Sequence, residues 1–356
     1  MAQYILGLEI GNANIKLLEC RKQGMQLMIE KSRIIPTPEG IVCDGIIMDS
    51  ESIYNIINEE IKKGKYKSKD IVAVIKSSEI ITRDIRMDEM PKKDMEAILA
   101  LQYQEHLLVD IEAYQVTYKV VQKAQETQVE GQEQELLIVA APNKIIYPLL
   151  DVATRLKMRM RSINIASDAI THLFLKESPI TAINEHEIMV IDIGGTSTTV
   201  TIVSDGIGVL NRDIPFGLDA INPLMTREFG TKNTEAIETF KTQYAGIYED
   251  EIEDEQYGQY ISSVIKPMIQ YQLVAEIQRF LQFHFSRGKN KAIEKIYMIG
   301  GGSYLKNIGK YVTDLLGIPC VSGIELNQTH IQGDAEFEKQ SAYYINILGI
   351  VNEFWG

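Results

Sequence analysis

A short phrase occurs twice in this sequence, once in each half. The first copy, residues 7–16, reads GLEIGNANIK, and the second copy, residues 190–199, reads VIDIGGTSTT. Each copy predicts a strand that carries an acidic residue, Glu9 or Asp192, then a glycine turn and a return strand. The repeat therefore favours an α/β fold with two related lobes, whose hairpins face each other across a cleft.

Two facing hairpins of this kind would form a clamp for a chain of phosphates. Glycine lets the backbone approach a ligand closely, and the N–H groups of turns bind oxyanions. We expect phosphate contacts from Gly11, Asn12, Asn14 and Lys16 on one side and from Gly194, Gly195, Thr196 and Ser197 on the other. Carboxylates are the ligands that magnesium prefers, so Glu9 and Asp192 are expected to hold a metal ion, directly or through water.

Two further segments could bind a nucleoside. Residues 298–303 read MIGGGS, which predicts a strand, a glycine turn against which a base or ribose can lie, and a helix over 304–316. Glu238 and Lys241 are three positions apart on a predicted helix over 234–244, so both could reach ribose hydroxyls. The expected nucleoside contacts are Glu238, Lys241, Gly300, Gly301, Gly302 and Ser303. Each segment alone is also compatible with an ordinary turn or surface pair, and only their combination indicates a nucleotide site.

Composition narrows the class of protein. The formal charge of −13 argues against a nucleic-acid partner, because binding a phosphate backbone requires a basic surface. The three cysteines are far apart and predict neither a disulfide framework nor a zinc site, and the five histidines form no spaced cluster. We therefore expect a protein of the reducing cytoplasm.

Membrane insertion is not expected. No apolar run approaches the ~20 residues that cross a bilayer, and the sequence does not begin like a signal peptide. The apolar segment 343–355 has no Lys or Arg, so we expect a core helix rather than an interfacial anchor.

The chain divides into four expected parts. A first lobe covers residues 1–78, a β-α-β-β insertion that returns to this lobe covers 79–160, a connection covers 161–187, and a second lobe covers 188–356, with a helical subdomain at 230–290. Within the insertion, residues 80–87 alternate like an edge strand. The polar segment 122–135 predicts an exposed hairpin tip, and the acidic stretch 249–255 predicts a solvated loop.

Taken together, the four segments resemble the actin-like ATPase superfamily, with its two phosphate loops, adenosine loop and adenosine-side helix. Within it the chain is similar to the PilM family of type IV pilus assembly proteins, relatives of the division protein FtsA. The similarity spans nearly the whole chain and includes the opening phrase, the insertion with Pro91 and residues 110–116, Gly317-Ile318-Pro319 and the closing segment 346–350.

This resemblance implies ATP or ADP with Mg²⁺ as ligand, and slow or absent hydrolysis. The family usually carries Asp where this chain has Glu9, and serines where it has Asn12 and Asn14. The position that orients water in active members falls near Ala166, so the adjacent Asp168 is the candidate catalytic residue. Asp168 could instead be the N-cap of a helix that runs through Phe174.

The function that the resemblance implies is a cytoplasmic scaffold of the pilus machinery, recruited to the inner face of the cell membrane. In that family, a groove between the first lobe and its insertion binds the N-terminal peptide of a PilN-like inner-membrane protein, and nucleotide would control lobe closure. Residues 80–87 are a candidate for peptide capture. The pilus ATPases and a second copy of the chain are further candidate partners.

Three other functions stay open. An FtsA-like division filament would usually need a basic amphipathic membrane helix, which the sequence lacks. A small-molecule kinase would need an acidic base in the cleft, for which Asp168 is the one candidate. A platform of type II secretion would commonly continue into a membrane span.

Overall fold

The structure is a computed structural model. It describes residues 3–122, 133–174, 185–229, 264–286 and 292–355, together with Ser178, Ile180, Thr181, Ile183 and Ile247. The predicted helix over 234–244, with Glu238 and Lys241, lies outside the described residues, as do the acidic stretch 249–255 and most of the predicted hairpin tip.

Each of the two large sheets contains the same arrangement of five strands, and the first sheet has one more strand at its edge, which confirms the two-lobed α/β fold. The first sheet has the order β10-β6-β1-β2-β3-β16, and the second has the order β13-β12-β11-β14-β15. In each sheet an antiparallel three-strand meander is extended by parallel strands. The first sheet consists of β1 (Tyr4–Ile10), β2 (Asn14–Gln23), β3 (Gln26–Pro36), β6 (Asp70–Ile75), β10 (Arg159–Ile165) and β16 (Ile331–Gln332). The second consists of β11 (Glu187–Ile193), β12 (Thr198–Ser204), β13 (Ile207–Ile214), β14 (Lys295–Ile299) and β15 (Cys320–Ser322).

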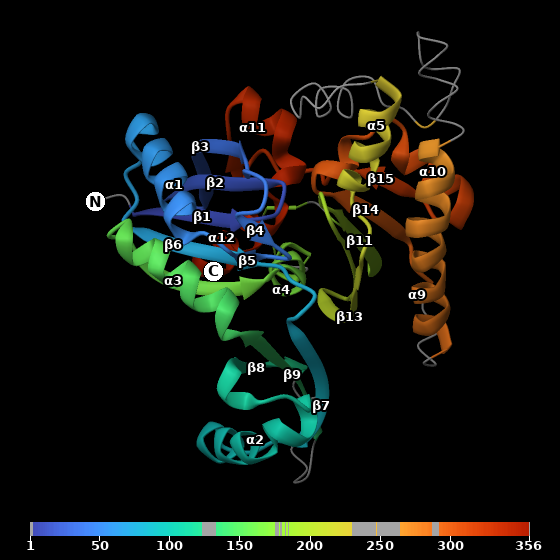
Figure 1. Cartoon of the computed structure of the whole chain (residues 1–356). Coiled ribbons are helices and arrows are strands. Elements are labelled where there is room, and N and C mark those ends of the chain that lie inside the picture. The colour runs from blue at the N-terminus through green and yellow to red at the C-terminus, as the bar shows by residue number, and fades with distance from the viewer. Residues whose placement is uncertain are drawn as a thin grey trace.

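Helices cover both faces of the two sheets (Figure 1). Helices α1 (Ser50–Gly64) and α3 (Asn143–Arg155) pack on the outer face of the first sheet. Helices α4 (Ala166–Leu173) and α12 (Ile345–Trp355) lie between the two sheets and share one core with both. The outer face of the second sheet packs against α9 (Ala275–Ser286), the preceding helix α8 (Lys266–Met268) with the π-helix Ile269–Val274, and α10 (Ile308–Leu316).

Local sequence explains where helix α1 begins. Helix α1 begins after Asp49, whose carboxylate accepts a hydrogen bond from the Ser52 N–H, and its apolar stripe buries Ile53 and Ile57.

The shorter elements are β4 (Val42–Cys43), β5 (Ile46–Ile47), α5 (Asn222–Phe229), α11 (Ala335–Gln340) and the 3₁₀ turns Ile111–Ala113, Leu218–Ile221, Gly301–Tyr304 and Ser341–Tyr343.

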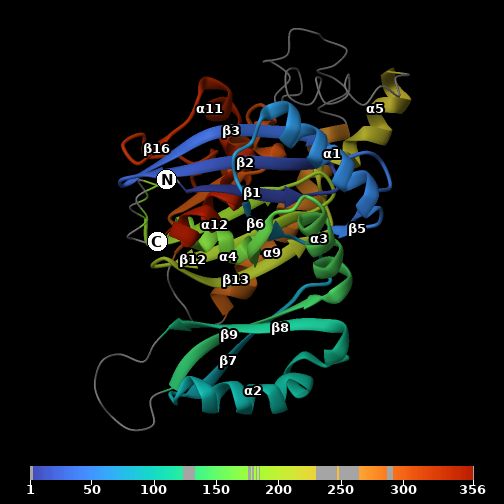
Figure 2. The ribbon, with the colours of Figure 1, turned by 90° about the vertical axis from the view of Figure 1, so that its left-hand side faces the viewer.

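A three-stranded sheet stands apart from the lobes. Strands β7 (Ile81–Asp88), β8 (Tyr114–Gln122) and β9 (Glu133–Pro142) pair in the order β7-β9-β8. Helix α2 (Lys92–Leu107) covers the face that points away from the two lobes (Figure 2). Both β7 and β8 are edge strands, which confirms the edge predicted at residues 80–87.

The C-terminal prediction is confirmed, while two helix starts were wrong. Residues 345–351 of α12 are all buried, as expected for a core helix. The glycine turn leads into a 3₁₀ turn, and the α-helix behind it begins only at Ile308. Asp168 lies inside the first turn of α4, whose N-cap is Ile165. Among the described residues, no helix is long and apolar enough to cross a bilayer.

Candidate functional site

The two repeated hairpins form equivalent turns that contact each other. The Gly11 N–H donates to the Asn14 carbonyl over 3.0 Å, and the Gly194 N–H donates to the Ser197 carbonyl over 2.9 Å. The Asn12 amide then donates to the Thr196 hydroxyl over 3.1 Å. The repeat in the sequence is therefore a repeat in space, closed across the two lobes.

A cleft of about 100 Å³ lies over these turns. The predicted residues that line it are Glu9, Gly11, Asn12, Asn14, Lys16, Asp192, Gly194, Gly195, Thr196, Ser197, Gly300, Gly301 and Gly302. Ser303 does not line this cleft, because its buried hydroxyl donates to the Gly300 carbonyl over 2.8 Å and so closes the glycine turn.

Bare backbone is required at the narrow parts of the cleft. A Cβ on Gly195 would lie 2.3 Å from Oδ2 of Asp219 and 2.7 Å from Cβ of Ala13 in the opposite hairpin. Gly300 has a φ of +76°, which favours glycine, and a Cβ there would lie 2.4 Å from Oδ1 of Asp192. These glycines let the three loops approach one another closely.

The two repeated acids are buried and each is paired with a lysine. Glu9 binds Lys16 over 2.6 Å, and Asp192 binds Lys76 over 3.3 Å. Burial raises the pKa of Asp192, but the charges of Lys76 and Lys16 outweigh this and lower the pKa below its usual value. Asp192 is therefore an anion at neutral pH.

Asn346, at the start of α12, connects the two acids. Its Nδ2 donates to Oδ2 of Asp192 over 3.1 Å and lies 3.4 Å from Oε2 of Glu9. Its Oδ1 is buried and has no hydrogen-bond partner among the described residues. A buried acceptor without a hydrogen bond lowers the stability of the fold, so this oxygen is suited to accept from a bound donor or to bind a cation.

Several lining residues were not predicted as site residues. They are Asp44, Gly45, Lys76, Asp219 and Tyr343, with Asn346 beneath the acids. Lys76 directly follows β6, a parallel neighbour of β1, and the carboxyl ends of parallel strands meet at one edge. This position, directly after a strand that neighbours β1, could have indicated Lys76 as a site residue. Asn346 is the one polar side chain in the buried apolar run 345–351 of α12, and this exception in the sequence could have indicated it.

Asp168 lies away from this cleft, at a different junction. It binds Lys119 of β8 over 2.7 Å, and its other oxygen lies 3.4 Å from Nε2 of His172. Burial raises the pKa of Asp168, but the hydrogen bond from His172 and the charge of Lys119 lower it to about 2. Asp168 does not line the cleft, and with this pKa it would be a weak base.

A second cavity, of about 460 Å³, lies between the insertion and the first lobe. Its walls include residues 115–119 of β8 and residues 160–165 of β10, and both strands are sheet edges. Leu137 and Val139 of β9 and Ile146 of α3 add apolar surface. The cavity lies against β8. The strand predicted for peptide capture, residues 80–87, forms the opposite edge of the same sheet.

Comparison with known proteins is consistent with this architecture. The family model described as type IV pilus assembly protein PilM matches residues 7–341. The solved PilM-PilN type IV pilus biogenesis complex is similar over 98% of both chains, with a TM-score of 0.79 and 21% identity. The ethanolamine utilization protein EutJ from Carboxydothermus hydrogenoformans has a TM-score of 0.55 and 14% identity, over 98% of this chain and 89% of that chain.

A third similar structure is MreB5 of Spiroplasma citri bound to ADP. It has a TM-score of 0.50 and 14% identity, over 98% of this chain and 95% of that chain. These structural similarities show the actin-like ATPase fold, and the family model covers most of the sequence. This chain belongs to the PilM family of type IV pilus assembly proteins.

Proposed function

We propose that this protein is a nucleotide-binding scaffold of the type IV pilus machinery, which holds an extended peptide in the cavity between its insertion and its first lobe. The partner is the N-terminal segment of a PilN-like inner-membrane protein, which recruits the scaffold to the cytoplasmic face of the membrane. Two findings support this: the family assignment and the likeness to a solved PilM-PilN complex.

The groove geometry is the observation that carries the peptide proposal. Strands β8 and β10 are both edges, and each lines the cavity. An edge strand presents unpaired backbone N–H and C=O groups, which can pair with an extended peptide. The apolar side chains of Leu137, Val139 and Ile163 would hold alternate side chains of such a peptide.

Adenine nucleotide with Mg²⁺ is the proposed ligand of the first cleft. The turns of the two hairpins would bind the phosphates, and the glycine turn at 300–302 would face the nucleoside. Glu9 and Asp192 fit a cation, because both are buried carboxylates, and the Asn346 amide that bridges them through its Nδ2 has a buried Oδ1 without a hydrogen-bond partner among the described residues. Because Glu9 is already paired with Lys16 and Asp192 with Lys76, we expect both acids to hold the cation through water molecules. Mg²⁺ would neutralise phosphate charge there.

A binding measurement tests the groove. A fluorescent peptide that copies the cytoplasmic N-terminus of the PilN-like protein should bind the full chain, with nucleotide and Mg²⁺ present. Leu137→Glu places a charge on the apolar wall and should weaken binding at least about tenfold. Leu101→Glu is the matched control, because Leu101 is 83% exposed on α2. Equal loss in both variants, or no binding to the unsubstituted chain, would contradict the proposal.

The family assignment favours this function over the filament and kinase alternatives. A kinase needs a base near the transferred phosphate, and Asp168, its candidate, lies outside the cleft. A phosphoryl-transfer screen against small alcohols should therefore give no product.

A further inference from the structure

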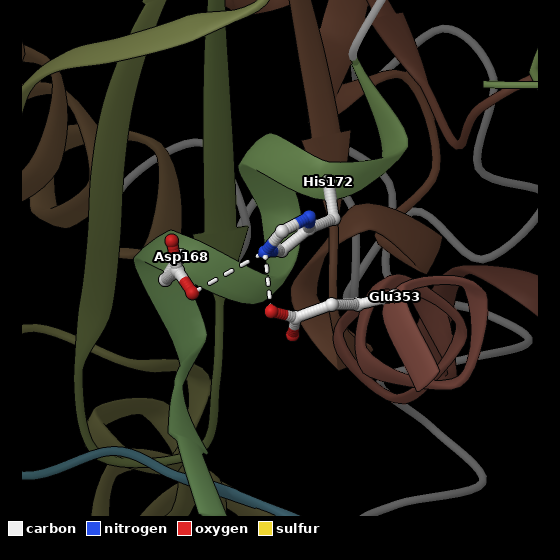
Figure 3. A group of neighbouring side chains, drawn as sticks. All are labelled: Asp168, His172 and Glu353. Atoms are coloured by element: carbon white, nitrogen blue, oxygen red, sulfur yellow. Dashed lines mark ion pairs between the residues drawn. The ribbon is translucent and has the colours of Figure 1, made fainter. Parts of the chain in front are cut away.

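Three side chains of two helices converge at the far end of α12 from the nucleotide cleft. Asp168 and His172 project from α4, and Glu353 projects from α12 toward them (Figure 3). Nε2 of His172 lies 3.4 Å from Oδ2 of Asp168 and 3.3 Å from Oε1 of Glu353. One ligand atom from each of the three lies within 4.8 Å of the others.

A lysine from the insertion enters the same cluster. Nζ of Lys119 lies 2.7 Å from Oδ1 of Asp168 and 2.9 Å from Nε2 of His172. The Lys119 side chain is 42% exposed, so it can leave this position without disturbing a packed core. The cluster therefore surrounds a cation that the protein itself supplies.

These contacts cannot all be hydrogen bonds at once. If Nε2 of His172 carries a proton, it faces the ammonium of Lys119, which has only donors to offer. If Nε2 is unprotonated, it accepts from Lys119, but its lone pair then faces the carboxylates of Asp168 and Glu353, which have only acceptors. In either state at least one close contact is unfavourable.

A metal ion in place of the ammonium would remove this conflict, since all three groups could then donate lone pairs to one centre. We propose that Asp168, His172 and Glu353 form a binding site for a divalent transition-metal ion, with Zn²⁺ as its model ligand and Lys119 as its competitor.

The observed spacing fits such an ion. Ligand atoms at ~2.0–2.1 Å from a tetrahedral Zn²⁺ lie about 3.3–3.4 Å apart, which matches the distances from Nε2 of His172 to the carboxylates of Asp168 and Glu353. One imidazole and two carboxylates are a donor set for transition metals, with a fourth position open for water. The Asn164 amide donates to Glu353 over 2.7 Å and to Asp168 over 3.4 Å, which orients both carboxylates.

Access to the site is available through a cavity of about 130 Å³ that Asp168 and Lys119 both line. Entry of the ion would displace Lys119 and break the ion pair between β8 and α4. The metal would thereby loosen the insertion from the core of the first lobe.

Titration of the full chain with Zn²⁺ tests the site. The titration is done with excess Mg²⁺, which occupies carboxylate sites that prefer hard cations and so leaves Zn²⁺ to the proposed site. Co²⁺ in place of Zn²⁺ gives a visible absorption spectrum that reports tetrahedral coordination. Lys119→Met removes the competing ammonium and should tighten Zn²⁺ binding at least about tenfold. His172→Gln and Glu353→Gln should each weaken it by a similar factor.

His186→Gln is the matched control, because His186 forms an ion pair of 2.8 Å with Asp205 on the second lobe. This variant should bind Zn²⁺ like the unsubstituted chain. Circular dichroism verifies that each variant is folded, and substitution of Glu353, which is 38% exposed, disturbs packing less than substitution of His172, which is 12% exposed. A Lys119→Met variant that binds no Zn²⁺, or equal losses in His186→Gln and His172→Gln, would overturn the proposal.

Discussion

Asn346 donates a hydrogen bond from its Nδ2 to Oδ2 of Asp192 over 3.1 Å. The same amide lies 3.4 Å from the carboxylate of Glu9. The acids come from hairpins of different lobes, and Asn346 lies in the first turn of α12, which is buried between the two sheets. Helix α12 therefore connects both lobes at the floor of the cleft.

Replacing Asn346 with Ala should weaken the binding of ADP with Mg²⁺ about tenfold and lower the melting temperature. The substitution leaves two buried carboxylates without their shared donor, which costs about 1–3 kcal/mol. Thermal unfolding with and without nucleotide measures both effects. Asn352→Ala, near the other end of α12, is the control. Identical behaviour of the two variants would show that the bridge is unimportant.

Lys76→Met should destabilise the protein by about 2 kcal/mol at neutral pH, below the 3–5 kcal/mol of fully buried pairs, because Lys76 is 19% exposed. The folded-state pKa of Asp192 is lowered, so this pair stabilises the fold above the unfolded pKa and loses its effect as pH falls through the folded pKa. The difference from the unsubstituted chain should therefore shrink in acid.

Urea unfolding at several pH values measures this difference. Lys144→Met, which breaks an exposed pair with Glu79, should cost at most about 1 kcal/mol. A pH-independent effect of Lys76→Met would mean that Asp192 is not the group involved.

Gly349→Ala tests the contact between α12 and α4. A Cβ on Gly349 would lie 1.9 Å from the backbone carbonyl oxygen of Ala169, which cannot rotate away. Overpacking of this kind costs about 1–3 kcal/mol or more, whereas Ala in a helix gains only about 1 kcal/mol over Gly. A net destabilisation of at least about 1 kcal/mol is expected in urea, and a stabilised variant would contradict the packing.

The hairpin repeat could be predicted from sequence because a strand, its turn and its return strand are all local. Glu9 and Lys16 face each other in the β1–β2 register, as do Asp192 and Thr199 in the second hairpin. Each pairing depends on residues fewer than ten positions apart. Local pattern and turn chemistry were sufficient there.

Tertiary placement explains what the sequence could not supply. Asn346 reaches the acids only because α12 inserts between two sheets, which no local pattern describes. Asp168 was considered for the cleft from its place after the first lobe, but Lys119 of the insertion and His172 hold it elsewhere. Asp168, His172 and Glu353 come from two helices that are distant in the sequence, so no local spacing could indicate that they meet.

Cysteine labelling should report occupation of the cleft. Cys43 is exposed and precedes Asp44, which lines the cleft, whereas Cys20 is buried. Burial raises the pKa of Cys320 to about 12, so its thiolate is scarce at neutral pH. Iodoacetamide should modify Cys43 first, and ADP with Mg²⁺ should slow that modification severalfold. Mass spectrometry of peptides identifies the site; preferential labelling of Cys20 or Cys320 would contradict this environment.

The central claim is that two equivalent acidic hairpins hold one nucleotide between the lobes. Calorimetric titration of the full chain with ADP and Mg²⁺ tests it most directly. We predict one saturable site, weakened at least about tenfold by Asp192→Asn in a variant that still folds. Absence of binding to the unsubstituted chain, or equal affinity in the variant, would contradict the account.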